Sequence, residues 1–202
     1  MGIVRIGGSR EGAKGLPTLF AVAPAKSGST VSESPMLYCY SSGAQVIKFI
    51  LTFTAVRADQ PLTETEVRMD SEGLYRIDLQ AAGIKLALNT EYQWSISTLA
   101  GTESSAKDTV VGGRIRRVPA SPTLTASQAG KSKTPPAQAL RDAGIFYDAL
   151  AELIPLMEAQ PKDPALEKAH ADLLAQFGVV IPKAMRIPDA ARRQPEVKQG
   201  KK

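Results

Sequence analysis

Apolar and polar residues alternate with a period of two through much of the first half of the chain. The alternation is clearest in segments 47–53, 75–79 and 92–97, where a large apolar residue occupies every second position. Strands with one buried face give this pattern, and no helical period competes with it. Further strands are expected at 18–22, 36–40, 64–68 and 109–118. About seven strands within about 100 residues are typical of an immunoglobulin-like β-sandwich.

The spacing of apolar residues changes to a helical period in the last third of the chain. Segment 119–136 is rich in Ser, Thr, Ala, Lys and Pro, and is therefore predicted to be a linker. Beyond it an apolar stripe from Ile145 to Met157 predicts a helix with one buried face. Pro155 lacks a backbone donor and is expected to kink or end this helix near Ile154.

A second helix is predicted to begin at Asp163-Pro164, a capping residue followed by proline, and to end at Gly178. The expected fold is mainly β, an immunoglobulin-like β-sandwich followed by a C-terminal α-helical hairpin, and α+β overall. The predicted parts are a Gly/Arg-rich extended arm at 1–16, the sandwich at 17–118, the linker at 119–136, the helical hairpin at 137–182 and a basic tail at 183–202.

One short motif supports the sandwich. The spacing of Leu86, Thr90 and Tyr92 resembles the tyrosine corner of fibronectin type III domains. A tyrosine at the entrance of a strand can bury its ring and return its hydroxyl to nearby backbone. We therefore expect Leu86, Tyr92 and Trp94 to belong to the structural core, and the motif names no ligand.

The net charge of +5 is concentrated at one end of the chain. Residues 183–202 contain seven basic and two acidic side chains, so they carry the whole net charge. Nucleic-acid-binding domains carry basic residues on the folded body, interleaved with aromatic residues, and that arrangement is absent from this sequence. We expect no specific nucleic-acid partner, and only weak nonspecific attraction to anions through the basic tail.

The sequence offers few residues for catalysis or metal binding. His170 is the only histidine and Cys39 the only cysteine, too few for a zinc site or an internal disulfide. His170 is expected to be partly buried at a helix contact, and Cys39 to be a small buried apolar residue in a strand. We predict no catalytic residue, no metal and no cofactor, and hence that the protein is not an enzyme.

Two membrane-related signals are also missing from the sequence. No segment approaches the ~18 consecutive apolar residues that a transmembrane helix needs, so no transmembrane segment is expected. The first 30 residues lack the apolar core of a secretion signal, so we expect no signal peptide within this chain.

Three arginines, Arg114, Arg116 and Arg117, follow a glycine pair on the last predicted strand. Arginines on an exposed edge strand commonly protect it from pairing with other chains. They could instead form an interaction site for an acidic partner. The sequence leaves both interpretations open.

The order of several motifs resembles a bacterial domain-of-unknown-function family, the one numbered 928. The motifs are the arm at 5–15, the segment 19–40 with Thr-Val-Ser-Glu-Ser-Pro at 30–35, the strand at 92–94, the segment 107–118 and the segment 143–150. Cys39 stands where the resemblance leads us to expect an aromatic residue. The resemblance implies an exported protein, located in the periplasm or secreted, and it carries no established activity.

These observations predict a non-catalytic protein-binding or structural module of the bacterial cell envelope or exterior. A protein partner or self-assembly, as a subunit of a larger assembly, is the expected mode of action. A glycan-binding β-sandwich is the alternative and would need aromatic side chains exposed as stacking platforms. An uncharacterised enzyme is the third hypothesis.

Overall fold

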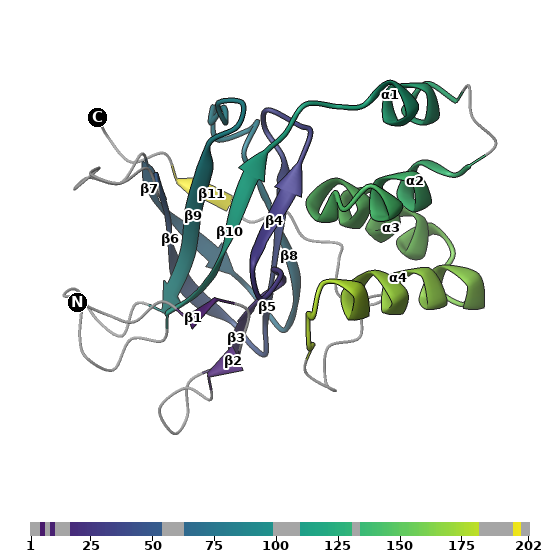
Figure 1. Cartoon of the computed structure of the whole chain (residues 1–202). Coiled ribbons are helices and arrows are strands. Elements are labelled where there is room, and N and C mark those ends of the chain that lie inside the picture. Colours follow the sequence, from purple (N-terminus) through teal and green to yellow (C-terminus); the bar gives the residue numbers. More distant parts are fainter. Residues whose placement is uncertain are drawn as a thin grey trace.

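The computed structural model describes residues 5–6, 9–10, 17–53, 63–98, 110–130, 134–181 and 196–198. These residues form two β-sheets and four helices, an α+β arrangement, with the helices on one side of the strands (Figure 1). All seven segments predicted as strands overlap observed strands. The helical portion is larger than the predicted hairpin.

The two sheets differ in size. The order in the larger sheet is β1 (Arg5–Ile6), β10 (Val110–Arg117), β9 (Glu91–Thr98), β6 (Gln45–Phe53), β7 (Thr63–Met69) and β11 (Glu196–Lys198), with β4 (Ser27–Thr30) also on β10. The order in the smaller sheet is β2 (Ser9–Arg10), β3 (Leu19–Ala21), β5 (Met36–Ser41) and β8 (Gly73–Asp78).

Buried residues from both sheets and from the helices form one hydrophobic cluster. Strand β9 shows how the sequence pattern becomes packing, because Tyr92, Trp94 and Ile96 are buried while the residues between them are half-buried. Strand β5 is buried at nearly every position, which is expected of a strand that is covered on both faces. The alternation along the sequence therefore identified the core-facing side of β9 correctly, while the predicted core-facing side chains at 49, 51 and 53 lie outside the described ones.

Strand β10 is not an exposed edge. It pairs antiparallel with β9 on one side, and parallel with β1 and β4 on the other. Strand β4 covers Arg114 to Arg117, so the expectation that these arginines protect an open edge is wrong. The sequence Ser-Gly-Ser-Thr of β4 contains no large apolar residue, and for that reason the alternation pattern did not predict the strand.

The four helices are α1 (Pro122–Gln128), α2 (Pro136–Asp142), α3 (Phe146–Ala159) and α4 (Pro164–Gln176). Helix α1 lies inside the segment predicted as a linker, which corrects that prediction. The Ser121 side chain caps α1 by accepting a hydrogen bond from the Leu124 backbone N–H at 3.3 Å, and Leu124 is buried. A capping signal was therefore present within a composition that favoured a linker.

Helix α3 continues through Pro155 to Ala159, so of the two expected effects of Pro155, the end of the helix near Ile154 is wrong. Ile154 and Met157 are buried on either side of the exposed proline. Their burial offsets the hydrogen bond that the proline cannot make. Helix α4 begins as predicted, since the Asp163 carboxylate accepts from the Ala165 N–H at 2.8 Å.

The two ends of the chain contribute strands. Strands β1 and β2 lie in the arm predicted at 1–16, and β11 lies in the tail predicted at 183–202. Strand β11 pairs with β7, so the tail is not wholly an unpaired end as its composition suggested. The other residues of the arm and tail lie outside the described part of the chain.

Candidate functional site

The N-terminal turn of α3 inserts a tyrosine against the β-strands of the two-sheet unit. The Tyr147 hydroxyl accepts a hydrogen bond from the Trp94 indole N–H at 3.1 Å and donates one to the Arg114 carbonyl at 3.0 Å. Glycines make room for the ring, because a Cβ at Gly28 would lie 2.7 Å from Tyr147 Cε2 and one at Gly113 would lie 3.2 Å from its hydroxyl. Burial raises the pKa of the Tyr147 hydroxyl, which therefore stays protonated as a donor.

The next residue of α3, Asp148, holds the loop between β4 and β5. Its carboxylate accepts a hydrogen bond from the Val31 backbone N–H at 3.3 Å. Burial raises the pKa of Asp148, while hydrogen bonds from Thr30, Val31 and Ser32 oppose that shift. These contacts tie the helices to the Thr-Val-Ser-Glu-Ser-Pro loop at 30–35. Arg76 of β8 forms a further ion pair with Glu158 at the other end of α3.

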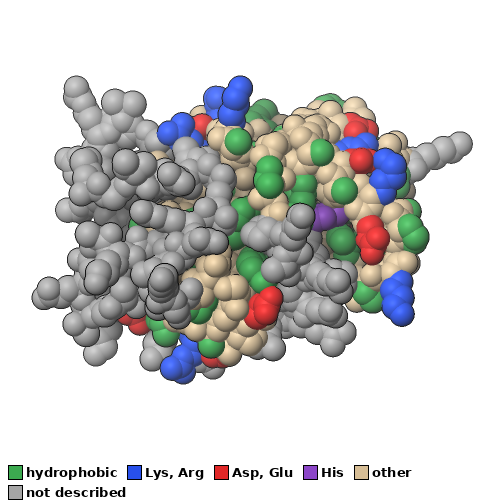
Figure 2. Space-filling view, turned by 90° about the horizontal axis from the view of Figure 1, so that it is seen from below, with side chains coloured by type: hydrophobic (Ala, Val, Ile, Leu, Met, Phe, Trp, Pro, Cys, Tyr) green, Lys and Arg blue, Asp and Glu red, His purple; other side chains and the backbone are tan. Residues whose placement is uncertain are grey.

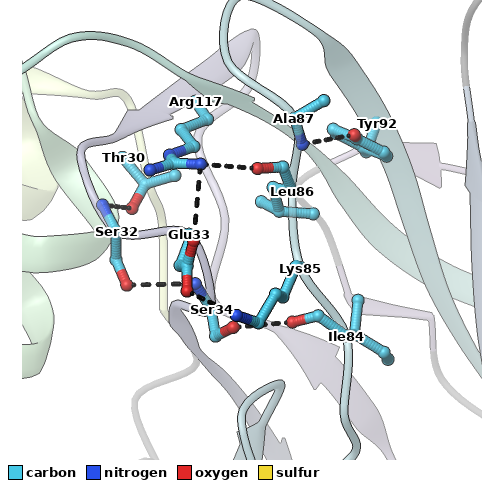
Figure 3. Close-up of polar contacts among 10 residues, drawn as sticks. All are labelled: Thr30, Ser32, Glu33, Ser34, Ile84, Lys85, Leu86, Ala87, Tyr92 and Arg117. Atoms are coloured by element: carbon cyan, nitrogen blue, oxygen red, sulfur yellow. Dashed lines mark hydrogen bonds and ion pairs between the residues drawn. The ribbon is translucent and has the colours of Figure 1, made fainter.

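Charged side chains hold the opposite side of the same loop (Figure 3). Glu33 pairs with Lys85 at 3.0 Å and with Arg117 at 3.9 Å. The hydrogen bond from Lys85, followed by the charge of Lys85, lowers the pKa of the Glu33 carboxyl. The Ser34 hydroxyl donates to the Ile84 carbonyl at 2.7 Å. The loop is thus fixed between the helices and the connection from β8 to β9.

The predicted tyrosine corner lies beside this network (Figure 3). The Tyr92 hydroxyl accepts from the Ala87 backbone N–H at 2.7 Å, and Arg117 donates to the Leu86 carbonyl at 2.9 Å. Asn89 adopts a positive φ of 58° and donates its N–H to the Arg117 carbonyl at 2.8 Å. Leu86, Tyr92 and Trp94 are all buried.

The structure does not bring the three predicted arginines together. Ile115 and Gly113 face the core, so Arg114 and Arg116 lie on the outer face of the larger sheet. Arg114 is half-buried and Arg116 is exposed. Arg117 points to the other face and takes part in the loop network. Only Arg114 and Arg116 can therefore share one interaction surface.

A shallow hollow of about 200 Å³ adjoins the loop network. It is lined by Ser32, Glu33, Ser34, Gln80, Gly83 and Lys85. The lining is polar and includes no aromatic side chain. A glycan-binding surface normally presents aromatic rings to the sugar. All five tyrosines and the single tryptophan are at most 2% exposed, which gives no support to the glycan-binding alternative.

The only cysteine and the only histidine are both buried. Burial raises the pKa of the Cys39 thiol, so Cys39 is not an activated nucleophile. His170 is buried, so that the single histidine shows only as a small purple patch (Figure 2), and burial lowers its pKa to about 4. Within the described residues, no group of three His, Cys, Asp or Glu side chains could hold a metal ion. No helix in the described ranges has the length and apolar content to cross a bilayer.

The fold and the network define an α+β protein in which a two-sheet β unit and a group of four helices share one core. The family model described as Domain of Unknown Function (DUF928) matches residues 5–182, and the chain belongs to this family. A comparison with curated proteins finds no match. Among solved structures, the chain is similar to an engineered protein from the Northeast Structural Genomics Consortium at 10% identity, with a TM-score of 0.33. That alignment covers 52% of this chain and 21% of the other, and the likeness carries no argument about fold or function.

Three segments that carried the family resemblance meet at the contact between helices and strands. They are the loop at 30–35, the segment 107–118 in its described part, and the helix start at 143–150. Tyr147 and Asp148 were not among the residues predicted from the sequence pattern. Two polar residues in the first turn of a helix whose neighbouring positions are apolar were the signal that could have identified them.

Proposed function

We propose that the protein is a non-catalytic protein-binding or structural module of the bacterial cell envelope or exterior, acting as a subunit of a larger assembly. The observation that carries this proposal is the use of the polar groups at the contact between helices and strands. Tyr147, Asp148 and Arg117 are engaged in hydrogen bonds that hold elements together. Buried polar groups used in this way stabilise a single geometry, which suits a rigid binding module.

The surface that best fits a partner is the outer face of β10. Arg116 is exposed there, and Arg114 lies two residues away on the same face. Ser27 and Ser29 of β4 lie opposite these two arginines in the sheet register. Two guanidinium groups beside hydroxyl-bearing residues suit a protein partner that presents carboxylates. This surface is the interaction site that we propose for an acidic partner.

The test is photo-crosslinking in the bacterium that makes the protein. A photoreactive amino acid replaces Arg116, and in a matched control it replaces Glu167, an exposed residue of α4. We expect a discrete protein adduct from position 116 and none from position 167. An absence of adducts at position 116, or equal adducts at both positions, would overturn the proposed binding face.

The proposed location is outside the cytoplasm, in the periplasm or secreted, and its support is the family resemblance. Cell fractionation tests the location directly. We expect the protein in the periplasmic or extracellular fraction, and recovery in the cytoplasmic fraction alone would contradict the proposal.

We also propose that the two sheets form an immunoglobulin-like sandwich. The pairing of β3, β5 and β8 in one sheet and of β10, β9, β6 and β7 in the other supports this assignment. The tyrosine at the entrance of β9, with its hydroxyl bound to backbone five residues earlier, supports it further. An experimental structure in which these strands pair in another order would contradict it.

A further inference from the structure

Strand β7 is the last long strand of the larger sheet, and its outer side is occupied by β11 from the C-terminal tail (Figure 1). The pairing is antiparallel, with Glu196 opposite Arg68, Val197 opposite Val67 and Lys198 opposite Glu66. Each charged residue of the tail segment thus lies opposite a residue of the other sign. Opposite charges at directly facing positions favour a register in antiparallel sheets.

The two paired segments have nearly the same sequence. Residues 66–68 read Glu-Val-Arg, and residues 196–198 read Glu-Val-Lys. An antiparallel pair places the first residue of one segment opposite the last residue of the other. A segment of this type is therefore complementary to a second copy of itself, and the outer side of β7 is self-complementary.

We propose that two copies of this chain associate through β7, paired antiparallel about a two-fold axis at Val67, and that the tail segment 196–198 occupies the same edge and blocks the association. In this arrangement Glu66 lies opposite Arg68 of the second copy, and Arg68 lies opposite its Glu66. The contact is isologous, so it closes at two copies and joins the two larger sheets into one. Glu66 and Arg68 are both exposed in the single chain, as this requires.

The lengths of the two pairings explain why the tail can block the edge and still be displaced. Strand β11 pairs with β7 over three residues, whereas two copies of β7 centred on Val67 would pair over the five residues from Thr65 to Met69. The longer ladder has more backbone hydrogen bonds. The tail is tethered to the same molecule, so its effective concentration is high and it occupies the edge in dilute solution. Substitutions that remove the charge complementarity between the tail segment and β7 should therefore free the outer edge of β7.

This inference deepens the proposed assembly role and rests on it, and charge exchanges in the full chain test it. In the first variant, Glu196→Lys combined with Lys198→Glu, the tail residues face like charges on β7, while β7 itself is unchanged. We expect light scattering to show a monomeric wild-type chain and a dimeric variant at the same concentration. Unchanged Trp94 fluorescence and circular dichroism would show that the variant is folded.

A second variant restores the tail pairing. Adding Glu66→Arg and Arg68→Glu to the tail exchange makes the tail and β7 complementary in charge again, and we expect this fourfold variant to return to a monomer.

Two control variants change β7. Glu66→Arg with Arg68→Glu in an otherwise native chain keeps β7 self-complementary but places like charges opposite the native tail, so this variant should dimerise. Arg68→Glu added alone to the tail exchange places like charges across the two-fold axis and should prevent the dimer.

Two outcomes would overturn the inference. The first is a tail-exchanged chain that stays monomeric over the full concentration range. The second is a dimer that persists in the variant with Arg68→Glu added, because that dimer would use another surface. The photo-crosslinking experiment at position 116 tests the proposed function independently of this inference. An adduct at position 116 without dimerisation through β7 would support the proposed function and contradict this inference. Dimerisation through β7 without an adduct at position 116 would contradict only the proposed binding face.

Discussion

The Tyr147 hydroxyl provides the most direct test of how the helices are joined to the strands. Tyr147→Phe keeps the ring and removes the group that accepts from Trp94 and donates to the Arg114 carbonyl. The site is fully buried, and a buried polar group that loses its partner costs about 1–3 kcal/mol of unfolding free energy. For a chain of this size, that loss corresponds to a melting temperature lower by roughly 2–12 °C.

The assay is urea and thermal unfolding followed by the fluorescence of Trp94, the single tryptophan. Tyr75→Phe is the matched control, because the buried Tyr75 hydroxyl also makes two hydrogen bonds, both to the Ser71 backbone in the connection from β7 to β8. Hydrogen exchange should rise along α3 in Tyr147→Phe and stay unchanged there in Tyr75→Phe. If Tyr147→Phe unfolds like the wild type and exchanges no faster in α3, the hydroxyl does not join helices to strands.

Three further predictions concern the buried histidine, the buried cysteine and the tail. The unfolding free energy should fall as the pH drops from about 6.5 to about 4, by up to roughly 3 kcal/mol, because the unfolded chain protonates His170 before the folded chain does. Urea titrations should show this slope in the wild type and a weaker one in His170→Gln. Cys39 should resist Ellman's reagent in the native protein and react fully in denaturant, and rapid native reaction would contradict its burial. Removing residues 183–202 should abolish salt-sensitive binding to anionic vesicles, and salt-resistant binding that survives truncation would point instead to Arg114 and Arg116.

The strands that could be predicted from the sequence are those that bury one face against the core. Tyr92, Trp94 and Ile96 determine the orientation of β9 by their apolar area alone, and that information is local. Strand β4 is different, because its Ser-Gly-Ser-Thr sequence forms a strand through pairing with β10 and close approach of Tyr147 to Gly28. A contact between residues 28 and 147 has no signature in either segment.

The candidate site shows the same division. Arg114, Arg116 and Arg117 could be noticed as a charged group, yet the sheet places Arg117 on the opposite face from the other two. The burial of Tyr147 and the hydrogen bond that Asp148 accepts from the 30–35 loop depend on how α3 meets the strands. Helical spacing predicts which side of α3 is apolar, but it does not predict which element that side contacts.

The chain ends lead to a further physical conclusion. Strand β1 pairs with β10, β2 with β3, and β11 with β7, so short strands from the ends cover three places where a sheet could pair with another molecule. Two- and three-residue strands make few backbone hydrogen bonds, and they open at a lower free energy than the core. Changes at the chain ends should therefore alter association between molecules before they alter the fold. Of the three pairings, the one between β11 and β7 has a charge pattern that specifies its register, and for this reason the self-association inference rests on β7.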